Sequence, residues 1–306
     1  MAWRALLSNR PIRRVDLLAC KPAALAAWTH RDRVTVLDLQ HGAKIDELIF
    51  EEPGGNEYLS APWRTYVASL KAPGDVTLPV VRAGKVDVRS SKDGHMRLYR
   101  AGDGALTVEA SNALQPLALE ADTTILAMAL SANGALVALL DRKGRLHLYQ
   151  GHVRTGVFEV GLHPLDELAP ALAVTDDGTR VIASDGLRLS VVDEAGRIIR
   201  RTETPYPLGT LACSGDGKWL VTTDLESNVI RAYASADLTV THQRFVVDLL
   251  ADARRAQVLP VAVTTGAAVG PITINARGVV AFATSSGLVC ATSLTRMKPV
   301  PRSGSN

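Results

Sequence analysis

Histidine and aspartate residues in short turns are the first residues of this sequence that could do chemistry. His30 and His95 fall in turns that we predict to be equivalent in two successive repeats, and Asp32 or Asp93 lies close to each. Two imidazoles with a carboxylate are donors that zinc accepts, but no tight ligand spacing accompanies them. We therefore predict exposed turn histidines, and neither a metal nor a cofactor.

A serine and a carboxylate pair are the other candidates for catalysis. Ser214 lies in "LACSGDG", a hairpin-turn sequence without the strand-to-helix elbow that exposes the nucleophile of a serine hydrolase. Asp176 and Asp177 precede Gly178, where the turn itself favours aspartate. The stretches "EEPGGNEY" and "RAGDGAL" lack the Lys-Ser of a phosphate-binding loop. No catalytic residue is predicted.

Composition narrows the class of protein. The chain has 306 residues, of which 47% are hydrophobic, and a formal charge of +3, which gives no reason to expect nucleic acid as a partner. The three cysteines, Cys20, Cys213 and Cys290, lie far apart in apolar runs and indicate reduced core thiols. No secretory signal is recognised. No membrane span is recognised either, because proline and glycine interrupt the longest uncharged stretch, 256–276. We expect a cytoplasmic protein.

The elements that must position these residues are strands in repeated hairpins. The phrase "LSANGALVALLDRKGRLHLYQG" recurs with its first glycine at positions 84, 134, 178, 217 and 278, at spacings of 50, 44, 39 and 61 residues. In each copy, glycine or aspartate turns separate three or four runs of strand length. A diverged copy occupies 15–52. The pattern predicts six four-stranded antiparallel meanders.

This period is typical of the blades of a β-propeller, since one such sheet buries its faces only when neighbours stack on it. We predict an all-β fold, one propeller domain over 1–306, with six blades and seven as the alternative for a chain of this length. The last repeat lacks a fourth strand, so residues 1–8, which contain "AWRALLS", are expected to close the ring by joining the last blade. Residues 296–306 are expected to form a flexible tail.

The hairpin pattern resembles that of bacterial WD-repeat-like propellers over nearly the whole chain. The resemblance implies the propeller fold and brings no ligand or partner with it. The Trp-Asp pair that ends the third strand in that family is absent, and the family's His, Ser or Thr, Asp and Trp tetrad is not visible. The pairs that stand in its place are Leu37-Asp38, Tyr99-Arg100, Tyr149-Gln150, Val192-Asp193 and Tyr233-Ala234.

The first of two insertions, 53–75, is rich in aromatic residues. It carries Tyr58, Trp63 and Tyr66 in a chain whose aromatic content is 5%. Tyrosine and tryptophan dominate interface hot spots, so these side chains are candidates for a partner-binding surface. The alternative is a strand of an irregular blade whose aromatic side chains pack inward.

The second insertion, 245–270, opens with apolar residues at helical spacing, among them Leu249 and Leu250. We predict a short helix laid against the rim of the propeller. Docking of the same apolar face into the groove of a partner is the alternative, and Leu249 and Leu250 would then be the contact residues.

Basic residues concentrate near both termini. Residues 1–33 contain seven basic and two acidic side chains, and residues 270–306 contain four basic and no acidic ones. If the termini meet, this basic sector, with Arg10, Arg13 and Arg14 at its centre, would attract an acidic protein surface or a phosphate-bearing partner. The alternative is a solvated rim of unpartnered arginines.

Two functions of different classes follow. The first is a non-enzymatic scaffold for protein–protein interaction, a subunit or adaptor of a multi-protein assembly. The second is a small-molecule hydrolase, lactonase-like or glycan-acting, with its site at the mouth of the propeller channel. Nucleic-acid binding ranks last, because the basic sector lacks interleaved aromatic residues for stacking.

Overall fold

The structure is a computed structural model whose described residues belong to two compact units. Unit 1 combines residues 1–18, 22–49 and 205–306, and unit 2 combines residues 19–21 and 50–204. The described residues are 2–7, 12, 14–18, 23–28, 33–49, 85–91, 96–101, 104–110, 113–168, 170–225, 228–246, 248 and 269–300.

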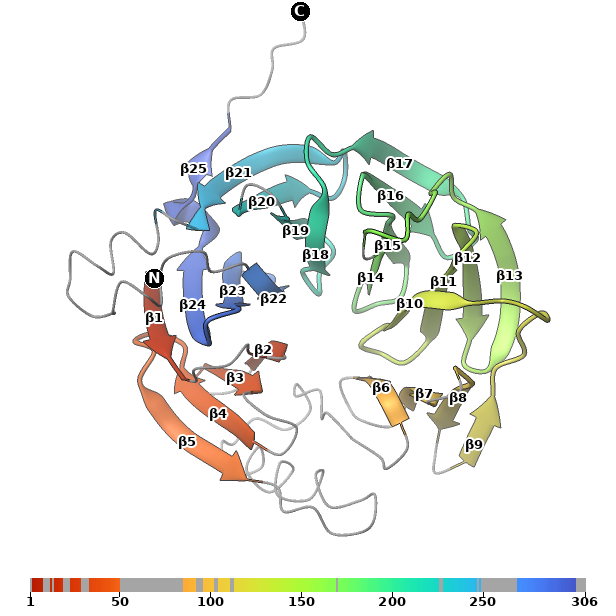
Figure 1. Cartoon of the computed structure of the whole chain (residues 1–306), viewed down its shortest axis with the longest axis horizontal. Coiled ribbons are helices and arrows are strands. Elements are labelled where there is room, and N and C mark those ends of the chain that lie inside the picture. Colours follow the sequence, from red (N-terminus) through yellow and green to blue (C-terminus); the bar gives the residue numbers. More distant parts are fainter. Residues whose placement is uncertain are drawn as a thin grey trace, which may run out of the picture. The chain divides into compact units, whose positions relative to one another are not determined.

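Unit 1 contains three antiparallel sheets, each built mainly from consecutive strands (Figure 1). Two of them gain a strand from a distant part of the chain. The first sheet is β2 (Arg14–Leu18), β3 (Ala24–Trp28), β4 (Arg33–Asp38) and β5 (Lys44–Ile49); the second is β18 (Leu208–Cys213), β19 (Trp219–Asp224), β20 (Val229–Ala234) and β21 (Thr239–Phe245), with β25 (Lys298–Pro299); the third is β22 (Val269–Ile274), β23 (Val279–Thr284) and β24 (Leu288–Ser293), with β1 (Ala2–Leu6).

Unit 2 also contains three antiparallel sheets, and each is a meander of four consecutive strands. The predicted four-stranded meander is therefore confirmed for these described sheets. They are β6 (Lys85–Ser90), β7 (Met96–Ala101), β8 (Leu106–Ala110) and β9 (Ala113–Pro116); β10 (Ile125–Leu130), β11 (Leu136–Asp141), β12 (Arg145–Gln150) and β13 (Val153–Glu159); β14 (Ala171–Val174), β15 (Arg180–Ser184), β16 (Arg188–Asp193) and β17 (Ile198–Glu203).

Apolar side chains between neighbouring sheets form the core of each unit. In unit 1, Phe282 and Cys290 of the β22–β24 sheet pack against Ile230 of β20. In unit 2, Leu148 of β12 packs in one cluster with Val181 of β15. Each sheet thus buries its faces against sheets rather than helices, as the repeat pattern predicts. Cys290 is buried and Cys213 is half-buried, and neither forms a disulfide with another described residue. Cys20 lies outside the described residues.

The N-terminal strand β1 completes the last sheet as its outer strand. It runs antiparallel to β24, with Ala2 opposite Thr292 and Leu6 opposite Leu288 (Figure 1). The backbone N–H of Leu7 continues the ladder by donating to the carbonyl of Gly287 at 3.2 Å. The pairing predicted for the first residues with the last repeat is therefore confirmed.

The C-terminal segment departs from the predicted tail. A 3₁₀ turn, η1 (Leu294–Arg296), is followed by Met297, which is only 3% exposed and belongs to the core cluster of unit 1. Burial of this side chain directs the next residues onto β21, where Lys298 pairs with Gln243. The prediction of a flexible tail is therefore wrong for residues 296–300, and residues 301–306 lie outside the described residues.

The repeat near Gly84 is shifted by one strand from the prediction. The first strand of its sheet is β6, which begins after Gly84, so the turn equivalent to Gly134 lies within 92–95. Tyr99 consequently lies on the second strand instead of the third. The shift arises because every hairpin in a repeat uses glycine and aspartate turns, and one turn is easily mistaken for the next.

The same shift separates the two turn histidines. His30 falls between the second and third strands of its sheet, whereas His95 falls between the first and second strands. The predicted equivalence of these two turns is therefore wrong. Both histidines are outside the described residues.

Candidate functional site

The residues predicted to bind a partner lie almost entirely outside the described residues. The backbone of Arg14 is described as the first residue of β2, but its side chain is not described. Their roles in partner binding therefore stay predictions. The others are Tyr58, Trp63, Tyr66, Arg10, Arg13, Leu249 and Leu250.

The serine considered as a nucleophile serves the turn in which it lies. Ser214 is fully buried, its hydroxyl donates to Asp216 Oδ1 at 2.7 Å, and it accepts the N–H of Trp219 at 3.0 Å. Thr175 makes the same contacts with Asp177 and Arg180 in the β14–β15 turn. These hydroxyls close the first turn of their repeats, which confirms the turn interpretation of both Ser214 and Asp177.

The carboxylates of these turns are held in the charged form. The Thr175 hydroxyl is the main cause that lowers the pKa of Asp177, and the N–H of Thr179 adds to it. A general acid or base would instead need a pKa near the working pH. Asp177 is therefore a poor candidate for proton transfer, as its place in the turn predicts.

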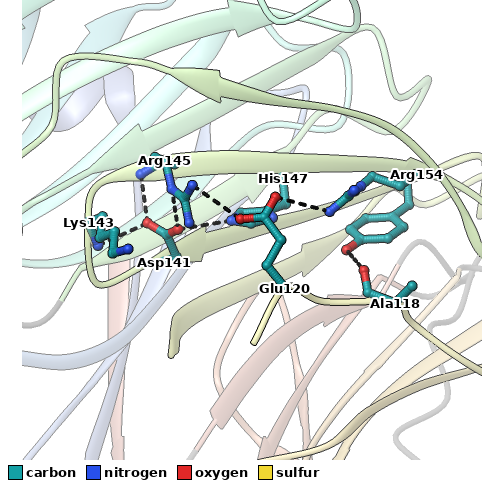
Figure 2. A network of polar contacts seen from close by, with 8 residues as sticks. Ala118, Glu120, Asp141, Lys143, Arg145, His147 and Arg154 are labelled. Carbon is teal, nitrogen blue, oxygen red and sulfur yellow. Dashed lines mark hydrogen bonds and ion pairs between the residues drawn. The ribbon is translucent and has the colours of Figure 1, made fainter. Parts of the chain in front are cut away.

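A dense polar cluster lies at the second turn of the β10–β13 sheet, between β11 and β12 (Figure 2). Asp141 ends β11, and its Oδ1 accepts the N–H groups of Lys143 at 2.9 Å and Arg145 at 2.8 Å. Its Oδ2 accepts from Arg145 Nε at 2.8 Å and lies 3.0 Å from His147 Nε2. One buried carboxylate thus binds four donors of the turn and of β12.

His147 is fully buried on β12. Its Nε2 contacts Asp141, and its Nδ1 has no hydrogen-bond partner among the described residues. An aspartate that orients a histidine is part of many hydrolytic sites. Here, however, the carboxylate is saturated with donors and the imidazole is closed to solvent. This pair is suited to fixing the turn rather than to reaching a substrate.

The cluster reaches the surface through Glu120, in the connection between β9 and β10 (Figure 2). Glu120 lies 3.4 Å from Arg145 Nη1 and 3.5 Å from Arg154 Nη1. Nearby, the Tyr149 hydroxyl donates to the carbonyl of Ala118 at 2.9 Å, and burial raises the pKa of Tyr149. These contacts tie the connection to β12 and β13.

A second connection, 160–168, lies across two turns of unit 2. A Cβ placed on Gly144 would lie 2.0 Å from the carbonyl oxygen of Leu162, so the β11–β12 turn packs directly on this connection. On the other side, the N–H of His163 donates to Asp185 Oδ2 at 2.9 Å, in the β15–β16 turn. A Cβ on Gly186 of that turn would lie 2.8 Å from Leu168. The connection is therefore held by both turns.

Exposed apolar side chains occupy this fixed region. Leu165 is 50% exposed on the connection, and Leu187 is 37% exposed in the β15–β16 turn. Arg142 reaches from the β11–β12 turn to Asp166, with Nη2 2.7 Å from Oδ1, and both side chains are largely exposed. Arg142, Leu165, Asp166 and Leu187 are called the turn-end surface below.

The turn-end surface offers contact rather than catalysis. Its polar members are an exposed ion pair, and its apolar members are two leucines on a backbone that the turns hold in place.

In the described part of the chain, no group of three or more His, Cys, Asp or Glu side chains could hold a metal ion. The same residues include no helix long and apolar enough to cross a membrane.

Sequence reasoning missed both the Asp141 cluster and the turn-end surface. A signal for the first was present, since "RLHLY" places Arg145, His147 and Tyr149 on one face of a strand. The exposure of Leu165 and Leu187 was not predicted, because leucine is a typical core residue and each of them stands singly between polar, proline or glycine residues.

Comparison with solved structures supports the propeller fold. The chain is similar to the β-propeller domain of Cps50 (Swd1) from Myceliophteria thermophila, with a TM-score of 0.65, at 10% sequence identity, covering 93% of this chain and 96% of that domain. At this identity the likeness shows the fold alone. No protein-family model and no curated protein sequence matches the chain.

Proposed function

We propose that the protein is a non-enzymatic propeller scaffold that binds protein partners, as a subunit or adaptor of a multi-protein assembly. The observation that carries the proposal is the exposure of Leu165 and Leu187 on segments that two turns hold in place. The two leucines lie on segments that contact each other, since a Cβ on Gly186 would lie 2.8 Å from Leu168, and exposed apolar side chains that form a contiguous patch mark interaction sites.

The turn-end surface is already ordered before a partner arrives, which favours binding. Association costs free energy for every loop and side chain that becomes ordered at an interface. The connection 160–168 is already held by the Asp185 contact, the packing of Gly144 and the Arg142–Asp166 ion pair. A partner would therefore meet a preorganised patch, with the exposed ion pair at its polar rim.

The two insertions and the basic sector belong to the same proposal. Trp63 and Tyr66 of the first insertion would supply aromatic contacts, and Arg10 and Arg13 would favour a partner with an acidic surface. The pairing of β1 with β24 supports this idea, because it brings the N-terminal strand beside the last sheet.

Affinity capture from the native cell extract, followed by quantitative mass spectrometry, tests the proposal. We expect a stoichiometric partner with the wild type, and its loss from a variant carrying Leu165→Ser and Leu187→Ser. Val153→Ser is the matched control, because Val153 is also an exposed apolar residue of unit 2, at 58%, but lies on β13. Absence of any stoichiometric partner at low salt would overturn the proposal and favour screens for hydrolase substrates.

A further inference from the structure

The outer strand β17 presents an unusual sequence for an exposed edge. It reads Ile198, Ile199, Arg200, Arg201, Thr202 and Glu203, and all but Thr202 are exposed. The two isoleucines are 38% and 39% exposed. In the described part of the chain, β17 pairs only with β16, so its other edge carries backbone groups available to a further strand.

Unit 1 shows how such an edge is used. Strand β25 adds to the outer edge of β21, with His242 opposite Pro299 and Gln243 opposite Lys298. The N–H of Val300 donates to the carbonyl of Thr241 at 2.9 Å. An extended segment thus binds the outer strand of a sheet in this protein through main-chain hydrogen bonds.

The equivalent position on β17 follows from the strand registers. In the β18–β21 sheet, Thr241 is the extra residue of a β-bulge, because Ala232 pairs with His242 and Tyr233 pairs with Val240. In the β14–β17 sheet, Val191 pairs with Arg200 and Val192 with Ile198, which makes Ile199 the extra residue. Ile199 therefore corresponds to Thr241, and its carbonyl corresponds to the group that receives Val300. The backbone N–H of Arg201, two residues further along the strand, faces the same outer edge of β17.

Charge indicates what kind of segment would add there. Arg197 is already paired with Asp193, at 2.7 Å. Arg200 and Arg201, in contrast, have no carboxylate within ion-pair distance among the described residues. The guanidinium of Arg201 lies against Gly161, since a Cβ there would be 2.3 Å from its Nη2, and the side chain is thus held in position. Arg200 and Arg201 point to opposite faces of β17, and a segment that alternates acidic and apolar residues places all its carboxylates on one face, where they would meet Arg201.

The outer strands β13 and β5 lack this combination. On β13, Gly156 occupies the position equivalent to Arg200, and Val157 the position equivalent to Arg201. On β5, the corresponding residues are Asp46 and Glu47, which would repel an acidic segment.

We propose that β17 binds an extended acidic segment of a partner protein by antiparallel strand addition, with a partner N–H donated to the carbonyl of Ile199. The inference rests on the proposed scaffold function and names the chemistry of one partner. The carboxylates of the segment would lie on one face of the extended sheet and pair with Arg201, and its apolar residues would lie on the opposite face.

Binding of a short labelled peptide that alternates valine with glutamate, followed by fluorescence polarisation, tests the proposal. Arg201→Gln removes a charge but keeps the N–H, and we expect roughly threefold weaker binding, the effect of one exposed ion pair. Arg201→Pro also removes the edge N–H, and we expect weakening by roughly tenfold or more. Val157→Pro, at the equivalent position of β13, is the matched control and should bind as the wild type does.

Hydrogen exchange of the same samples reports the site directly. The outward-facing amides of Arg201 and Glu203 should exchange more slowly when the peptide is bound, while those of β13 stay unchanged. Slow exchange of this edge in the protein alone would overturn the proposal, because a segment of the chain itself would then cover β17. Equal binding of a peptide with lysine in place of glutamate, or full binding by Arg201→Pro, would also overturn it.

The outcome is separable from that of the scaffold proposal. If the peptide fails to bind while affinity capture still yields a stoichiometric partner, the scaffold function stands and only the β17 site is wrong. If no partner is captured, the scaffold function fails whatever the peptide does.

Discussion

The imidazole Nε2 of His147 lies 3.0 Å from Oδ2 of Asp141, and both side chains are closed to solvent, with exposures of 0% and 2%. The same carboxylate accepts two backbone N–H groups of the β11–β12 turn and the Nε of Arg145. This turn also carries Gly144 and Arg142, which hold the connection 160–168. The buried pair thus supports the surface that we propose for partner binding.

Asp141→Asn should lower the free energy of unfolding by about 2–4 kcal/mol, because buried donors lose a charged acceptor. Urea denaturation followed by circular dichroism measures this change. Asp193→Asn is the matched control, since Asp193 also closes a turn and binds Arg197, whose side chain is 81% exposed. The control should cost less than about 1 kcal/mol, and an equal loss in both variants would contradict the assignment.

The contribution of Asp141 should depend on pH. Burial of the carboxyl acts to raise its pKa, but the hydrogen bonds from His147 and Arg145 outweigh burial and hold the pKa below its ordinary value of 3.8. A folded-state pKa below the unfolded one adds stability that is present above about pH 3.8 and lost as pH falls through the folded value. The stability difference between wild type and Asp141→Asn should therefore shrink in acid.

Urea titrations of both proteins from neutral pH to about pH 3 measure that difference. Taking the difference removes the similar effects of Asp177, Asp193 and Asp216, whose pKa values are also lowered. A gap that stays constant across this range would show that the charge of Asp141 does not contribute.

Gly144→Ala should be strongly destabilising, by about 3 kcal/mol or more, because it combines a left-handed backbone with a clash. Gly144 has φ +79°, and the new Cβ would meet the Leu162 carbonyl. Gly151→Ala shares the positive φ, +62°, but meets nothing within 4 Å, and should cost only about 1 kcal/mol. Thermal unfolding of the two variants compares them, and similar melting temperatures would rule out the tight contact with the connection.

The aromatic insertion and the basic sector give a separate prediction about partners. A variant carrying Trp63→Ala, Tyr66→Ala, Arg10→Ala and Arg13→Ala should lose a stoichiometric partner in affinity capture while its melting temperature holds. Raising the salt concentration should weaken the wild-type interaction as well, if the arginines steer an acidic partner. If the variant retains every partner, the first insertion and the basic sector do not bind them, and the contacts lie on other surfaces.

The repeated turns explain why the sheets could be predicted from the sequence. Gly134, Gly178 and Gly217 all have positive φ, which the sequence pattern around them demands, and the runs between them have strand length. The pairing of β1 with the last repeat could be predicted because that repeat has only three strands of its own. The shift near Gly84 occurred because turn chemistry marks a hairpin without showing which strand of the sheet comes first.

The candidate sites could not be predicted in the same way. The Asp141–His147 pair depends on a register between β11 and β12 that places both residues on one face. The equivalence of Ile199 and Thr241 depends on β-bulges, which leave no glycine or proline signature in either strand. Exposure of Leu165 depends on how a connection is anchored by turns from other repeats, and no local pattern encodes that.

The pairing of β1 with β24 also sets an order of events for the nascent chain. The ribosome makes β1 long before β24, so β1 must wait while the strands between them are synthesised before its ladder partner exists. Contacts between such distant residues slow folding, and the waiting strand offers an open edge to other chains. A circular permutant that joins the two termini would make these strands neighbours in the chain and should shorten that vulnerable interval.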